Sequence, residues 1–393
     1  MAAAAEEAKA SLENGPGALE RALLAAWASG PLAGRLQAFV RAAARREAAL
    51  GGAATLVLVH NELRKSAKRQ AEPGHEHVLQ PWRGGAAFHF GKVPPDEVVL
   101  APAELPELRV LVNLFPVAEA HCLLASTGPV PQCFTSAASE AFLRAALALF
   151  LRDGVGALPR RWVLFFSSFG ANASVNNLHA QLIPHPFAED GHDDDHHGHA
   201  SQGRERRRLY LEAVPLRCAH RRPWGRVLEL DEAAAADGAR EALAAGRPAP
   251  PPSLRVVVFD LDSAAGLRDM CGDLHALLDW LARADISHNF CSLRRGLGLD
   301  PGGDSTLRIA VIPRRVKSFA TAGAGVEPAA LELLGMLVVF DRATFESFDA
   351  AQYDALKSRV ELDREPYRRL MHDELPALFG VGGTSLASDD DIA

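Results

Sequence analysis

The stretch 174–184, SVNNLHAQLIP, places a single histidine among amide side chains. Its alternation of polar with apolar residues predicts a β-strand, in which successive side chains point to opposite faces. Asn177, His179 and Gln181 would then share one face lining a cleft, and Leu178, Ala180 and Leu182 the other. A histidine can attack phosphorus while amides hydrogen-bond the phosphate oxygens. On spacing alone, a lone histidine in a strand is more often a hydrogen-bonded structural residue than a nucleophile.

The segments that must position this histidine are those of an α+β protein. A run at 136–152 has apolar residues at helical spacing, with Ser136 or Ser139 as its N-cap. Short apolar runs broken by Pro, Gly or Asp predict strands at 54–60, 87–93, 97–101, 108–116, 120–126 and 161–169. The first half of the chain therefore predicts a few strands packed against one helix.

The second half repeats this arrangement. Strands are expected at 254–262, 286–296 and 305–315, helices at 263–285 and 363–379, and a helix or helix–strand unit at 328–340. The simplest architecture is two α+β halves, each with antiparallel strands packed against a helix.

Changes in composition suggest the boundaries. We expect a helical N-terminal segment at 1–50, a catalytic domain at 51–212, a second domain at 213–380 and an acidic tail at 381–393. A flexible acidic and His-rich loop is expected at 189–203, and a linker-like Ala/Pro-rich insert at 231–253.

Bulk composition narrows the function classes. The chain has 393 residues, 48% of them apolar and 23% charged, with a net charge of −7, which gives no sign of an obligate nucleic-acid partner. The five cysteines are scattered and form no Cys-x-x-Cys pair, which is typical of a reducing compartment. No convincing signal peptide and no apolar run of membrane-spanning length is present, so we expect a cytoplasmic protein with no membrane partner.

Several blocks of the sequence resemble one family. SSFGANASVNNLHAQ resembles the active-site segment of the GDP-D-glucose and GDP-L-galactose phosphorylases, in the nucleotidyltransferase branch of the histidine-triad superfamily. Segments 59–100 and 110–126, with LLDWLARADISHNFCSLRRG and LRIAVIPRRVKSFA, resemble further family blocks in the family's order. The resemblance spans roughly residues 55–375 and implies two histidine-triad-like halves, with antiparallel sheets packed against helices.

The resemblance also implies roles for particular residues. His179 would be the nucleophile and Gln181 would bond the phosphate under attack. Asn113 would lie near the ribose, His121 behind or beside the phosphate, and Lys92 near the diphosphate. Asn177 and Ser174 complete the expected substrate-binding set of Lys92, Asn113, His121, Ser174 and Asn177. The implied substrates are a GDP-hexose and inorganic phosphate.

Three positions depart from the family pattern. Asn177 replaces the first histidine of the motif, Ala118 replaces a glutamate, and Ala120 replaces the glycine before His121. Two alternatives to an active GDP-hexose phosphorylase follow. One is a catalytically impaired nucleotide-sugar-binding relative. The other is a dinucleoside-tetraphosphate phosphorylase or adenylyltransferase.

The remaining motifs give weaker signals. HDDDHHGH at 192–199 has the composition of a metal chelator but lies in a low-complexity stretch, so we expect no metal site there. The expected reaction needs no cofactor. The sequence predicts no oligomeric state and does not choose between the two GDP-hexoses.

Overall fold

The computed structural model describes residues 18–51, 54–67, 77–80, 88–152, 162–187, 209–245, 254–294, 307–315, 326 and 328–380. The predicted loop at 189–203, the tail at 381–393 and the motif at 192–199 lie outside these ranges. Within them, no helix is long and apolar enough to cross a membrane.

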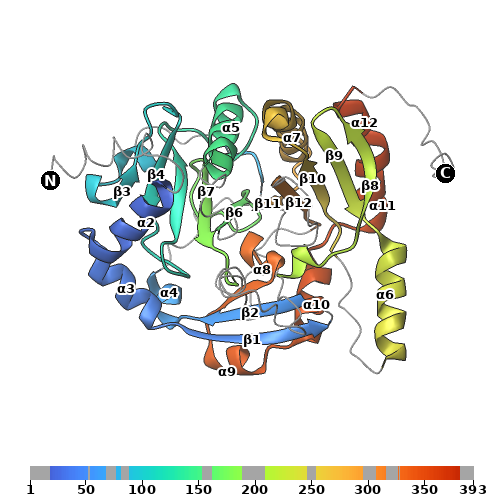
Figure 1. Ribbon diagram of the computed structural model, residues 1–393, viewed down its shortest axis with the longest axis horizontal. Coiled ribbons are helices and arrows are strands. Elements are labelled where there is room, and N and C mark those ends of the chain that lie inside the picture. Colours follow the sequence, from blue (N-terminus) through green and yellow to red (C-terminus); the bar gives the residue numbers. More distant parts are fainter. Residues whose placement is uncertain are drawn as a thin grey trace, which may run out of the picture.

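One ten-stranded antiparallel sheet runs through both halves of the chain (Figure 1). Its strand order is β3-β4-β5-β7-β6-β11-β12-β10-β9-β8. In chain order the strands are β3 (Val98–Leu100), β4 (Leu108–Val112), β5 (Cys122–Ser126), β6 (Trp162–Ser167), β7 (His179–Pro184), β8 (Leu216–Arg222), β9 (Gly225–Leu230), β10 (Val257–Leu261), β11 (His288–Arg294) and β12 (Leu307–Pro313). The two halves meet where β6 pairs with β11, with Phe166 opposite Phe290. The α+β class with antiparallel sheets is confirmed, whereas the boundary at 212/213 stays a prediction.

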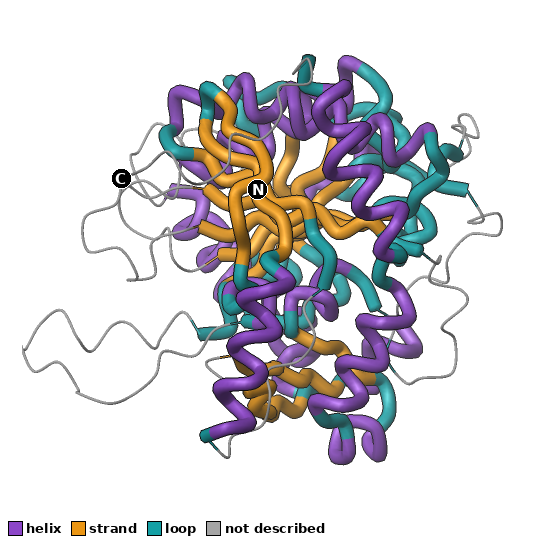
Figure 2. The backbone as a smooth tube through the Cα atoms, turned by 90° about the vertical axis from the view of Figure 1, so that its right-hand side faces the viewer, coloured by secondary structure: helices purple, strands orange, loops and turns teal. Residues whose placement is uncertain are grey.

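A second, three-stranded sheet lies apart from the large one (Figure 2). It consists of β1 (Ala44–Gly51), β2 (Ala54–His60) and β13 (Met336–Val339), with β2 in the middle. β1 and β2 form an antiparallel hairpin, and β13 pairs with β2 in parallel. The N-terminal and C-terminal parts of the chain are thus joined by main-chain hydrogen bonds.

Two long helices cover one face of the large sheet. α5 (Ala137–Arg152) and α7 (Leu267–Arg283) lie side by side over one face (Figure 1). The other helices are α2 (Ala18–Ser29), α3 (Ala33–Arg41), α4 (Glu62–Ala67), α6 (Glu232–Ala244), α8 (Ala330–Leu334), α9 (Arg342–Ser347), α10 (Ala350–Val360), α11 (Arg364–Arg369) and α12 (Leu375–Leu378), with a π-helical turn at Leu370–Glu374 between the last two.

Alternation along the strands assigns each face to one apolar core. Leu178, Ala180 and Leu182 pack in the core beneath α5 and α7, as the sequence predicts. The opposite face carries Phe165 and Ile183 into a second core under the three-stranded sheet. The helix predicted at 136–152 is confirmed, and the Ser136 hydroxyl caps it by accepting the Ser139 main-chain N–H at 3.2 Å.

Three predictions about local structure were wrong. Residues 44–50 form β1 rather than helix, because pairing with β2 outweighs the helix propensity of Ala, Arg and Glu. Where a strand was expected at 87–93, a 3₁₀ turn, Phe90–Lys92, forms. Part of the insert at 231–253 is helical: Asp231 caps α6 by accepting the Ala234 N–H, and the Ala-rich run continues the helix.

Candidate active site

A cavity of about 260 Å³ opens on the face of the large sheet that α5 and α7 leave uncovered. Four of its lining side chains come from strand positions that alternate onto this face: Leu111, Leu123, Phe165 and Gln181. The opposite wall comes from the C-terminal part of the chain, through Ala329 to Glu332 and Phe340. Both predicted halves therefore build one cavity.

His179 lines this cavity at the first residue of β7 and is 8% exposed. Its Nδ1 lies 2.8 Å from the main-chain oxygen of Asn177. A carbonyl can only accept, so Nδ1 carries the proton and Nε2 keeps its lone pair. Burial lowers the His179 pKa to about 4, which keeps the ring neutral at pH 7. The arrangement holds a neutral imidazole with one nucleophilic nitrogen.

Asn177 does not share a cavity-lining face with His179, contrary to the sequence interpretation. β7 begins only at His179, and the Asn177 side chain is fully buried beside the loops 88–92 and 126–130. Its Oδ1 accepts the Phe90 main-chain N–H at 2.8 Å. Its Nδ2 lies 3.0 Å from each of three oxygens, those of the Ser126 hydroxyl and the Gly128 and Val130 carbonyls. Asn177 thus supports His179 through its carbonyl and through Phe90, whose ring centroid lies 5.1 Å from the imidazole.

Gln132 holds the main chain of His179, a role that the sequence interpretation missed. The side-chain Oε1 accepts the His179 N–H at 2.8 Å. The Nε2 donates to the carbonyls of His179 and Ser167, at 3.0 and 2.9 Å. The pairing of β6 with β7 runs only to Phe165 opposite Gln181, so the Gln132 amide bridges the two strands beyond that pair. A glutamine in a Pro-rich turn gives no sequence signal for this role.

A second polar network fixes Gln181. His121 accepts the Val117 main-chain N–H at Nδ1, so its proton lies on Nε2. That nitrogen donates to Gln181 Oε1 at 3.0 Å, and the Asn113 amide lies 2.9 Å from the same nitrogen. Burial lowers the His121 pKa to about 3, so this ring is neutral. With Oε1 engaged, the Gln181 NH₂ group is the end left to donate to a ligand.

The cavity has two chemically different arms on either side of β7. Over β4 and β5 the lining includes an apolar cluster, and we call it the apolar arm; its residues are Phe88, Phe90, Val93, Leu111, Leu123 and Val175. The arm towards β6 and α8 carries hydroxyl, amide and carboxylate groups, and we call it the polar arm; its residues are Ser167, Asn172, Ser174 and Glu332. A flat apolar group suits the first arm and hydroxyl-bearing or anionic groups suit the second.

Two cationic side chains line the cavity. Lys92 lies in the 3₁₀ turn, as the predicted site requires. Arg64, on α4, was not singled out from the sequence, and its guanidinium donates to the Phe115 carbonyl. The predicted residues Lys92, Asn113, His121, Ser174, His179 and Gln181 all line the cavity, and Asn177 does not. In the described part of the chain, no group of three or more His, Cys, Asp or Glu side chains is placed to hold a metal ion.

Part of the chain that forms this site is similar to a known protein family. Residues 18–183 match the family described as "GDPGP1-like, N-terminal domain". The N-terminal part of this chain is therefore similar to a GDPGP1-like domain. The resemblance to the GDP-D-glucose phosphorylase family is thereby confirmed for the part that contains β1 to β7 and His179. A search of curated proteins gives no match.

Among solved structures, the chain is similar to yeast Ap4A phosphorylase Apa2 in complex with Ap4A. The TM-score is 0.55 at 15% identity, over 88% of this chain and 97% of the yeast chain. The yeast enzyme in complex with AMP gives a TM-score of 0.50 at 14% identity, over the same shares of both chains. The fold of the GDPGP1-like domain together with the C-terminal half is thus similar to that of a whole phosphorylase.

Proposed function

We propose that this protein is a nucleotidyl-transferring phosphorylase that cleaves a GDP-hexose with inorganic phosphate. The observation that carries the proposal is the Nδ1 contact of His179 with the Asn177 carbonyl, which leaves Nε2 as the nucleophile in a cavity. The GDPGP1-like domain supports the choice of a GDP-hexose.

The reaction follows from this geometry in two displacements. Nε2 of His179 attacks the α-phosphorus, the bond to the bridging oxygen breaks, and hexose 1-phosphate leaves. The guanylylated imidazole is positively charged, and the Asn177 carbonyl stabilises its Nδ1–H. An oxygen of inorganic phosphate then attacks the same phosphorus, the P–N bond breaks, and GDP leaves with neutral His179 restored. No proton has to enter or leave the ring.

The two arms determine the orientation in which the substrate would bind. The guanine and ribose would lie in the apolar arm, against Phe90 and Val93, with Asn113 near the ribose. The hexose phosphate, and later the incoming phosphate, would lie in the polar arm beside Ser174. The Gln181 amide and Lys92 would donate to the phosphate oxygens.

The Asn177 departure from the family pattern fits an active enzyme. The group that orients His179 is a main-chain oxygen, which any residue at 177 supplies. This supports the phosphorylase over the impaired relative.

The test is to trap the intermediate. GDP-hexose labelled on the α-phosphorus, without phosphate, should leave an acid-labile label on the wild-type protein and none on His179→Ala. His275→Ala is the matched control, because His275 lies on α7, over the other face of the sheet. A wild-type protein with neither adduct nor phosphate-dependent GDP release would refute the proposal.

The likeness to yeast Ap4A phosphorylase favours a second candidate, a dinucleoside-polyphosphate phosphorylase. Its substrate also presents an α-phosphorus between a nucleoside and a phosphate leaving group. Comparing kcat/KM for GDP-glucose, GDP-L-galactose and Ap4A separates the two candidates. Faster turnover of Ap4A than of either GDP-hexose would support the second.

A further inference from the structure

A buried arginine lies next to the residues that support the polar arm of the cavity. Arg314, directly after β12, is 2% exposed. Its main-chain N–H donates to the Ser287 carbonyl at 2.8 Å, and the N–H of Arg315 donates to the Val360 carbonyl at 2.9 Å. These two bonds join the backbone at 314–315 to the residue before β11 and to the end of α10. The side chain of Arg314 therefore projects from a backbone that is held on both sides.

The guanidinium of Arg314 bonds the residue that precedes the cavity wall at 329–332 and a side chain of β11. Its Nη1 donates to the Pro328 carbonyl at 2.7 Å and to Asn289 Oδ1 at 3.2 Å. The same Pro328 carbonyl accepts from Asn172 Nδ2 at 3.0 Å. Asn172 lines the cavity with a φ of 74°, a conformation that an outside contact must help to hold. One carbonyl therefore joins Arg314 to a cavity residue.

Asn289 extends the connection to the floor of the cavity. It is fully buried, and its Nδ2 donates to the Ser167 hydroxyl at 2.9 Å and to the Ala171 carbonyl at 3.1 Å. Ser167 lines the cavity on β6. Arg314 and Asn289 together bind the ends of β6, the 171–172 turn and the 328–332 wall into one unit.

Arg314 also places a positive charge behind this arm. Burial lowers its pKa to about 10, which still leaves the guanidinium charged at pH 7, and Glu332 acts in the opposite direction. Among the residues that the structure describes, no acceptor bonds its buried Nε or Nη2. A charge in such a low-dielectric setting acts strongly on anions nearby.

We propose that Arg314 is a positioning residue for the polar arm, where it sets the affinity for the phosphate acceptor. The proposal rests on the proposed function in naming inorganic phosphate as the ligand of this arm. The side-chain hydrogen bonds of Arg314 described above reach none of the apolar-arm residues, so the binding of a nucleoside monophosphate should be independent of Arg314.

The experiment compares Arg314→Lys and Arg314→Met with wild type. In Arg314→Met, which loses the charge and the hydrogen bonds, the KM for inorganic phosphate should rise about tenfold or more, while the Kd for GMP, which has no β-phosphate, changes less than about twofold. Arg314→Lys keeps the charge and should fall between them. Equal losses in both constants, or no change in the KM for phosphate, would overturn the proposal. If Arg314→Met does not fold, Arg314→Ala with added guanidinium ion replaces it, and a failure of guanidinium to restore the phosphate KM refutes the role.

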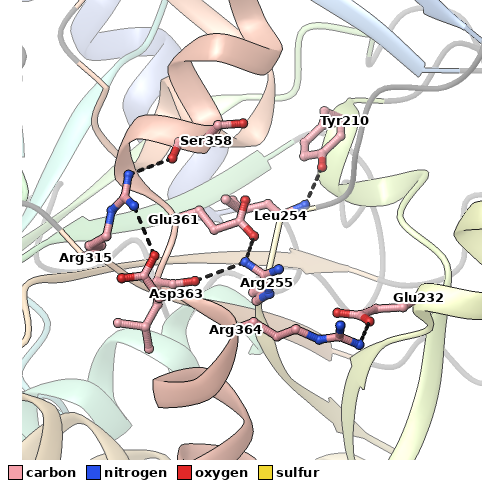
Figure 3. A network of polar contacts seen from close by, with 10 residues as sticks. Tyr210, Glu232, Leu254, Arg255, Arg315, Ser358, Glu361, Asp363 and Arg364 are labelled. Carbon is pink, nitrogen blue, oxygen red and sulfur yellow. Dashed lines mark hydrogen bonds and ion pairs between the residues drawn. The ribbon is translucent and has the colours of Figure 1, made fainter.

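Arg315→Gln is the matched control, because it removes a guanidinium from the next residue. Arg315 bonds Asp363 at 3.0 Å and the Ser358 carbonyl at 3.1 Å, in the network that ties α10 to the segment before α11 (Figure 3). Arg255 bonds Glu361 in the same network. The control should lower stability slightly and leave the KM for phosphate unchanged.

Calorimetric titration of inorganic phosphate separates failure of this proposal from failure of the proposed function. If wild type shows no phosphorylase activity, the proposed function fails. Phosphate binding to wild type that weakens about tenfold in Arg314→Met would still support the positioning role, and equal binding to both would refute it.

Discussion

At the scale of single residues, protonation decides whether His179 can react. The ring must be neutral to attack, and burial with a carbonyl on Nδ1 keeps it so. Two other buried histidines, His121 and His288, are also neutral. Both ring nitrogens of His121 bond protein groups, and His288 is not among the residues that line the cavity.

The pH dependence of activity should follow the His179 pKa of about 4. Because the reactive form is the unprotonated one, kcat/KM should be constant near neutrality and fall only as pH drops through this value. Measuring kcat/KM for GDP-hexose from pH 7 to pH 4 checks this. An acid limb centred near the ordinary histidine value of 6.5 would contradict the buried, neutral ring.

The Asn177 side chain should matter for stability rather than for chemistry. Asn177→Asp keeps the shape but turns a donor that faces three oxygens into an acceptor. We expect it to lower the free energy of unfolding by about 3 kcal/mol. Urea unfolding measures the change. Asn176→Asp is the control, since a donor bond from Asn176 Nδ2 reaches the Gln80 carbonyl at 3.3 Å, and an equal loss there would count against this account.

At the scale of elements, the position of His179 depends on how β6 and β7 are held beyond the pair Phe165–Gln181. The main-chain pairing of the two strands stops at that pair, and Gln132 bonds the main chains of both strands beyond it. Helix α5, by contrast, is specified locally by its apolar stripe and the Ser136 cap. The helix could be predicted from its own residues, whereas the role of Gln132 depends on strands that lie 35 and 47 positions away.

Removing the Gln132 amide should misplace the nucleophile without emptying the cavity. For Gln132→Ala we expect kcat to fall about 100-fold, because a displacement near 1 Å disrupts in-line attack. The Kd for GDP should change little. Steady-state kinetics with calorimetric GDP titration make the comparison, with Thr135→Ala in the same turn as control. Unchanged kcat would mean that the sheet alone positions His179.

At the scale of the whole molecule, the three buried histidines link stability to pH. Their pKa values, about 3 for His121 and about 4 for His179 and His288, lie below the unfolded value of 6.5. The unfolded state therefore binds more protons once pH drops below 6.5, so this stability is present above 6.5 and is lost towards pH 4. Each histidine contributes a slope of about 1.4 kcal/mol per pH unit in that window.

Urea unfolding at pH 7, 6 and 5 measures this loss. In His179→Ala, the unfolding free energy should fall less steeply with decreasing pH, because one of the three histidines no longer contributes its slope of about 1.4 kcal/mol per pH unit. Stability that stays constant from pH 7 to pH 5 would contradict the buried, neutral state of these rings.

The sequence by itself determined the α+β class, the helix at 136–152 and the alternation that separates His179 and Gln181 from their apolar neighbours, because side-chain periodicity and helix capping are local properties. The tertiary structure alone decided that residues 44–50 are a strand, because only the pairing with β2 makes them one. It also decided that the support of His179 comes from a carbonyl, that Arg64 and Glu332 line one cavity, and that Gln132 and Arg314 bond the segments behind it. Those contacts join residues far apart in the chain, and no local pattern encodes them.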